Sequence, residues 1–328
     1  TGCEYWYRSS TAVADDGGAE RHRTLPLPPR LSQTGCVDPA NPTIPAAGLI
    51  PYTVRWPFWV DGLTKSTWVA LPDGAVPTVS ADGDLSLPVG SVVMKEIRDG
   101  DTRVETRLMV HHEEGDWGAY AYLWNGDDAE LVEGAVRVEA STGSHTVPHR
   151  WQCTECHTEA AGATLGLELS QMSVALTYPS TGRTADQIVT WQHLGLLGDP
   201  LPEVIPLPLA EESDELEART RAWLHVNCSS CHRPGVERSG SIDLRYSTPL
   251  AETGAVMAVP TGEGLGLDDP RILVPGNPDR SLLVVRASRT DLHRMPPAGV
   301  TVVDTEGVAQ LRAWVAAMTP IPDDSGGP

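Results

Sequence analysis

The sequence predicts an α+β protein, in which an antiparallel, β-rich region precedes a mostly α-helical, loop-rich region. Three observations predict this class. Short segments rich in β-branched and aromatic residues, separated by tight turns, fill residues 51–140. Apolar residues take up a clear helical spacing later, most strongly in residues 211–227 and 305–318. The 28 prolines and 31 glycines of the 328-residue chain require much of it to be loop.

A chain of 328 residues suits two domains or three small ones. Changes in residue pattern predict an irregular N-terminal arm, an antiparallel β domain, a segment around a first cysteine motif, a helical domain around a second, and a flexible tail. Their bounds are 1–48, 49–148, 149–209, 210–320 and 321–328. Arginine- and proline-rich runs punctuate the arm, so we expect it to stay outside the core.

Two of the six cysteines, Cys3 and Cys36, lie in the arm. An even remainder of cysteines in an oxidising compartment predicts a disulfide. Lipidation of Cys3 is the alternative. We prefer the disulfide because lipoprotein processing cuts immediately before the modified cysteine, and two residues precede Cys3 here.

The β region begins after Pro51. Its strand candidates are short, and the turn Asp99-Gly100 joins two of them as a hairpin. The expected strands are Ser66–Leu71, Ser91–Ile97, Thr102–Val110, Gly118–Trp124 and Ala135–Ala140. Five or six such strands indicate a small antiparallel sheet or sandwich.

Two five-residue stretches share the pattern Cys-x-x-Cys-His, the attachment signature of haem c. Two thiols bond covalently to the porphyrin, and the adjacent histidine supplies an axial nitrogen to the iron. The residues are Cys153, Cys156 and His157 in the first motif, and Cys228, Cys231 and His232 in the second. Zinc would require a second ligand pair at short loop spacing, which neither motif has; two disulfides are the other alternative. The sequence therefore predicts two covalently attached haem c groups.

Four helices are expected around these motifs. Residues 186–197 place Val189, His193 and Leu196 on one face. An amphipathic helix over 211–227 leads into the second motif, with Leu216, Thr220, Trp223 and Leu224 as its buried stripe. The others are 279–287, opened by Asn277-Pro278, and 305–318, capped by Asp304.

The second half resembles a class I cytochrome c. A helix, the motif ending in His232, a loop, a Met-Pro-Pro stretch at Met295 and a final helix occur in that family's order. In the family, the methionine of Met-Pro is the sixth iron ligand. The resemblance therefore implies that Met295 is the sixth ligand of the haem at the second motif.

Most of the chain beyond the arm also resembles a family of bacterial diheme c-type cytochromes. The resemblance implies a β-rich N-terminal region fused to two haem segments, and no particular substrate. Its residues are Trp59–Gly62, Leu85–Gly90, Glu105–Leu108, Tyr120–Asn125, Gln152–His157, Leu165–Leu167, Asp243–Tyr246, Val274–Gly276 and His293–Pro297.

The first motif has no Met-Pro partner. His193 is the preferred sixth ligand for its haem, because it lies on a helix face with apolar neighbours 36 positions after His157. A lone histidine on such a face is more often a buried core residue, but a nearby iron needs a sixth ligand. Met172 and His112 remain alternatives.

The formal net charge of −20 makes nucleic acid and anionic membranes poor partners, and favours basic patches on other redox proteins. No apolar run is long enough to span a membrane. Haem c is attached outside the bacterial inner membrane, so we expect a periplasmic or extracellular protein whose leader has been removed.

The expected function is electron transfer between protein redox partners, with no catalytic residues, either alone or as a subunit of a larger complex or filament bound through the arm. A diheme peroxidase is the alternative. The two motifs lie too close in sequence for the two complete cytochrome domains of such enzymes, and the β-rich region is foreign to them.

Overall fold

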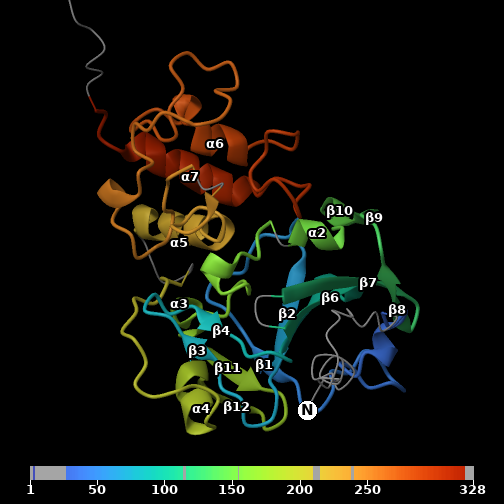
Figure 1. The fold of residues 1–328 in the computed structure, drawn as a ribbon. Coiled ribbons are helices and arrows are strands. Elements are labelled where there is room, and N and C mark those ends of the chain that lie inside the picture. The colour runs from blue at the N-terminus through green and yellow to red at the C-terminus, as the bar shows by residue number, and fades with distance from the viewer. Residues whose placement is uncertain are drawn as a thin grey trace, which may run out of the picture.

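The computed structural model bears out the predicted class: an antiparallel β-rich region at residues 50–147 precedes a helix-containing, loop-rich part (Figure 1). The helices α5 (Leu216–Cys228), α6 (Leu282–Ala287) and α7 (Thr305–Ala317) gather at one end of the molecule, and the main sheet lies at the other. The described residues are 3, 27–113, 116–153, 155–209, 215–237 and 240–321.

Six antiparallel strands form the main sheet in the order β1-β2-β5-β6-β7-β8. Four consecutive strands, β5 to β8, follow one another as hairpins, and the predicted turn at Asp99-Gly100 is confirmed. Gly100 takes the left-handed backbone (φ 57°) that this tight turn needs. The strands are β1 (Ile50–Tyr52), β2 (Thr64–Ala70), β5 (Val92–Asp99), β6 (Thr102–Glu113), β7 (Asp116–Asn125) and β8 (Asp128–Val132).

Residues 27–49 cover one face of this sheet. Side chains alternate between faces along a strand, so Leu108 and Val110 of β6 point to this side. Leu31 and Cys36 pack against them and are fully buried. The expectation that the arm stays outside the core is therefore wrong for its described residues, because the apolar sheet face needs a cover and these residues supply it.

A disulfide joins Cys3 to Cys36, as predicted. Cys3 is buried in the same core cluster as Cys36, and its backbone N–H donates to Gly35 O at 2.9 Å. Residues 4–26 of the arm lie outside the described residues. The disulfide thus fixes Cys3 against the body of the protein.

The segment around the first motif covers the opposite face of the sheet. Met109 of β6 and Val93 of β5 contact its core, which holds Leu167, Met172 and Trp191. Its helices are α2 (Arg150–Cys153), α3 (Leu169–Met172) and α4 (Gln187–His193), with the 3-10 turn η2 (Glu159–Ala161). Three two-stranded ribbons pair β3 (Thr78–Val79) with β4 (Leu85–Ser86), β9 (Val136–Ala140) with β10 (Gly143–Val147), and β11 (Ala175–Tyr178) with β12 (Arg183–Asp186).

Helix α4 buries a different face from the one expected. Its Asp186 cap accepts a hydrogen bond from Val189 N at 2.9 Å, but Val189 is 64% exposed. The buried residues are Gln187 and Trp191. Trp191 is the largest apolar side chain of the helix, and the Gln187 amide bonds backbone groups of Thr53, so these two side chains face the core instead.

The C-terminal part packs helix α5 against α7 (Figure 1). Trp223 and Leu224 of α5 meet Leu311 and Trp314 of α7 in its core. The Asp304 cap is confirmed, since its side chain accepts from Gly307 N at 2.9 Å. Its elements are α5 (Leu216–Cys228), η4 (Leu250–Glu252), η5 (Pro278–Arg280), α6 (Leu282–Ala287) and α7 (Thr305–Ala317); η1 (Leu31–Gln33) lies in the N-terminal part. Over the described residues, we find no helix long and apolar enough to cross a membrane.

Candidate haem sites

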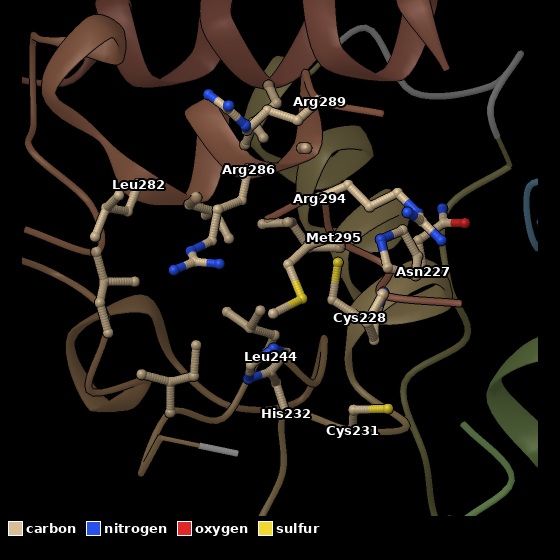
Figure 2. Close-up of a pocket in the computed structure, with 18 of the residues that line it drawn as sticks. Asn227, Cys228, Cys231, His232, Leu244, Leu282, Arg286, Arg289, Arg294 and Met295 are labelled. Carbon is tan, nitrogen blue, oxygen red and sulfur yellow. The ribbon is translucent and has the colours of Figure 1, made fainter. Parts of the chain in front are cut away.

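Helix α5 ends at Cys228 and delivers the second motif to a cavity of about 250 Å³, here called the second-motif cavity. Cys228, Cys231 and His232 line it, and so does Met295 from the loop after α6. In Figure 2 the side chains of Cys228, His232 and Met295 converge on the same space. The structure thus brings together all four residues that the sequence predicts for this site.

The rest of the second-motif cavity suits a porphyrin, a largely apolar ring with two carboxylate side chains. Leu224, Leu244 and Leu282 supply apolar walls. Arg286 and Arg294 also line it, and Figure 2 shows the Arg286 guanidinium directed into the open space. The Arg294 Nε is buried and has no hydrogen-bond partner, so a carboxylate would satisfy it.

The loop that follows Met295 is anchored on the β region by one carboxylate. Asp61 is fully buried, and its Oδ1 accepts from the backbone N–H groups of Thr301 at 2.6 Å and Val302 at 2.7 Å. Its Oδ2 lies 2.8 Å from His145 Nδ1. Burial alone would raise the pKa of Asp61, but the hydrogen bonds from His145 and these two backbone groups outweigh it and lower the pKa.

The first motif lies against the sheet. Cys153, Cys156 and His157 line a smaller cavity of about 80 Å³, here called the first-motif cavity, which Met109 of β6 also lines. Ala119 and Ala121 of β7 add small side chains to its wall. All three motif residues therefore face one space between their own loop and the sheet.

His157 is held as a metal-ligating histidine usually is. Its Nδ1 lies 2.9 Å from Ala163 O, so this nitrogen carries the proton and donates it, and Nε2 keeps a free lone pair. Burial, and then the charge of Lys95, lower the pKa of His157 to about 3. The ring is therefore neutral, as an iron ligand must be.

The two motif loops contact each other. Cys231 Sγ donates to Glu155 O at 3.0 Å, and Thr158 Oγ1 donates to Ser230 O at 2.7 Å. The Cys156 and Cys231 side chains also interact directly, and Cys156 lines the second-motif cavity as well as the first. The thioether positions of the two motifs are therefore neighbours.

The four motif cysteines do not gather around one point. Cys153 lines only the first-motif cavity and Cys228 only the second. In the described part of the chain, no three side chains of His, Cys, Asp or Glu are placed to hold a metal ion. This geometry gives no support to a four-cysteine zinc site.

The structure does not bring the candidate sixth ligands of the first motif to its cavity. His193 is exposed at the end of α4, which lies well apart from α2 in Figure 1. Met172 is a fully buried core residue. His112 Nε2 bonds Tyr120 Oη at 2.8 Å. Met109, which the sequence analysis missed, is the methionine that lines this cavity.

A third and larger cavity, of about 580 Å³, lies beside both motifs and is called here the sheet-side cavity. Lys65 and Lys95 line both this cavity and the first-motif cavity. Ser230 of the second motif and Thr164, which follows the first motif closely, also line it. The sheet-side cavity therefore lies between the two motifs. Sequence analysis did not single out either lysine.

Comparison with protein-family models, with curated proteins and with solved structures gives no match. The interpretation of these cavities therefore depends on their own residues and geometry.

Proposed function

We propose that this chain is a diheme c-type cytochrome that transfers electrons between protein redox partners. One observation carries the proposal: Met295, which is remote in sequence from Cys228, Cys231 and His232, lines the same largely apolar cavity as they do. A haem held there would supply a one-electron centre at its iron.

Each of these residues has a role that its chemistry supports. The thiols of Cys228 and Cys231 would hold the porphyrin covalently, and His232 and Met295 would provide the axial nitrogen and sulfur. A methionine ligand raises the reduction potential relative to a second histidine. At the first motif, Cys153 and Cys156 would hold the second haem.

The contact between the motif loops supports electron exchange within the chain. Because Cys156 and Cys231 are neighbours, the thioether edges of the two porphyrins would approach each other there. No intervening protein layer separates these two positions.

The partners are other redox proteins or cytochromes, with basic surfaces that complement a chain of net charge −20. The chain would act alone or in a larger complex. The Cys3–Cys36 disulfide is consistent with export to the periplasm or cell exterior, where haem c is attached.

Mass spectrometry and optical spectroscopy of the natively matured protein test the proposal. The denatured chain should exceed the polypeptide mass by two haem groups, and its reduced pyridine spectrum should be that of haem c. Cys231→Ala should leave one haem on a single thioether or abolish maturation. A mass equal to that of the bare chain would overturn the proposal.

The same sample distinguishes a carrier from a peroxidase. A carrier should show two low-spin haems. A high-spin haem at the first motif that binds hydrogen peroxide would instead favour the peroxidase, because such an enzyme needs an open sixth position on one iron.

A further inference from the structure

The lysines of this chain occur in one place. Of its 24 lysine and arginine residues only two are lysines, Lys65 and Lys95. Lys65 lies on β2 opposite Ile97 of β5, and Thr67 lies opposite Lys95. Directly opposed residues share a sheet face, and so do residues two apart in a strand, so the two lysines are diagonal neighbours on one face.

Neither ammonium group has a carboxylate partner among the described residues. Lys65 Nζ donates to Phe58 O at 2.6 Å, and Lys95 Nζ donates to Leu165 O at 3.0 Å. An ammonium has three N–H donors, so both groups retain donor capacity. The nearby Arg107 is already paired with Glu105. The two amines thus lie side by side with no described carboxylate in direct contact, and Glu105 acts on Lys65 only through its charge.

The cavities beside them are built to receive a polar ligand. Both lysines line the sheet-side cavity and the first-motif cavity. Thr164 also lines the sheet-side cavity; it is 4% exposed, and its hydroxyl has no hydrogen-bond partner. A buried hydroxyl and two incompletely satisfied cations are costly unless a ligand completes their hydrogen bonds.

The same burial affects the charge of the lysines themselves. Burial, and then the positive charge of Arg107, lower the pKa of Lys95 to about 8. Burial, followed by the charge of Lys95, lowers the pKa of Lys65 well below its usual value. A bound anion would reverse this effect by favouring the charged amines.

We propose that Lys65 and Lys95 form an anion-binding site that takes a carboxylate or a small oxyanion beside the first motif. Such a ligand has two sources. One is the carboxylate side chains of a haem attached at Cys153 and Cys156, which depends on the function proposed above. The other is a free anion from solution in the sheet-side cavity, which does not.

The test combines amine labelling with redox titration of the natively matured protein. Because the chain has no other lysine, acetylation followed by mass spectrometry of the peptides reports Lys65 and Lys95 individually. Sulfate and acetate are the added anions. Haem content is measured in every sample, so a failure of haem attachment is seen separately from a failure of the anion site.

If the ligand is a carboxylate of the haem, labelling of both lysines should be slow with or without added anion. The midpoint potential should be lower in Lys65→Met and Lys95→Met, because each variant loses a positive charge beside the porphyrin. A free anion predicts that sulfate or acetate slows labelling about tenfold at ten times its Kd. That protection should be absent when the partner lysine is methionine.

Two controls separate these effects from general charge and folding effects. Lys65→Arg keeps the positive charge and should change the potential less than Lys65→Met. Arg137→Met removes one exposed cation from β9 and should leave potentials and labelling unchanged. Rapid labelling of both lysines in the mature protein, unaffected by either anion, together with unchanged potentials in both methionine variants, would overturn the proposal.

Discussion

Replacement of Asp61 should destabilise the protein and release the loop that carries Met295. In Asp61→Ala, the backbone N–H groups of Thr301 and Val302, the Thr301 hydroxyl and the buried His145 Nδ1 lose an acceptor. Removal of one partner of a buried ion pair lowers the free energy of unfolding by about 3–5 kcal/mol. Asp61 also has a φ of 55°, which costs alanine about 1 kcal/mol more. The expected loss is therefore about 4–6 kcal/mol of unfolding free energy.

Asp61→Asn removes the negative charge of this side chain but keeps its shape. Asparagine tolerates the left-handed backbone and keeps one oxygen for the two backbone donors. It loses the charge-assisted bond to His145 and the longer bond from the Thr301 hydroxyl, at 3.2 Å, so we expect a loss of about 1–2 kcal/mol. Urea unfolding followed by circular dichroism measures the stability of both variants. In the proposed cytochrome, the near-infrared sulfur-to-iron band reports whether Met295 ligates the iron.

Asp99 is the matched control. It also accepts a hydrogen bond from a backbone N–H, that of Ser141 at 2.7 Å, but on the surface. Asp99→Ala should therefore leave the unfolding curve nearly unchanged. If Asp61→Ala proved as stable as Asp99→Ala, the anchoring role of Asp61 would be refuted.

The same network predicts a dependence on pH. Burial alone would lower the pKa of His145, but hydrogen bonds to Asp61 and Glu105 outweigh it and raise the pKa. A raised histidine pKa stabilises the fold fully below the unfolded value of about 6.5, and this contribution disappears as the pH rises through the folded pKa. The stability difference between wild type and Asp61→Asn should accordingly shrink above neutral pH.

Three further predictions concern the ligands and the disulfide. In the proposed diheme protein, Met295→Ala should abolish the near-infrared sulfur-to-iron band while both haems stay attached. In the same proposed protein, Met109→Leu should convert the first haem to high spin, whereas His193→Ala should not, because Met109 lines the first-motif cavity and His193 does not; the reverse result would restore His193 as the ligand. Loss of the Cys3–Cys36 bridge through Cys36→Ser should cost roughly 3–4 kcal/mol for a loop of this length. Two free thiols in a peptide map, or a lipid on Cys3, would contradict the bridge.

Features set by neighbouring residues were predictable from the sequence. The Asp99-Gly100 hairpin and the Asp304 cap each depend on a few adjacent side chains. The strand β8 (Asp128–Val132) was missed because it is short and half polar, and only pairing with β7 makes it a strand. Turn and cap chemistry is local, whereas strand pairing depends on the rest of the sheet.

Features set by tertiary packing were not predictable. Leu31 and Cys36 have no regular spacing, and their burial depends on an apolar sheet face that lies far along the chain. Alternation in β6 separates Met109 from Leu108 but does not say which of the two meets the first motif. In the sequence, Lys65 and Lys95 are two ordinary strand lysines. Only the pairing of β2 with β5 makes them neighbours.

The attachment of the Met295 loop to the β region also affects how this chain divides into modules. The segment 210–320 has the order of parts of a free-standing cytochrome. Yet Trp59 lines its cavity and donates from Nε1 to Val302 O at 2.8 Å, and Asp61 binds the adjacent backbone. Excised alone, the segment would lack the cavity wall that Trp59 supplies and the Asp61 carboxylate that holds the loop after Met295. The β region is therefore a structural component of the second-motif cavity, and the two cannot be exchanged or shortened independently.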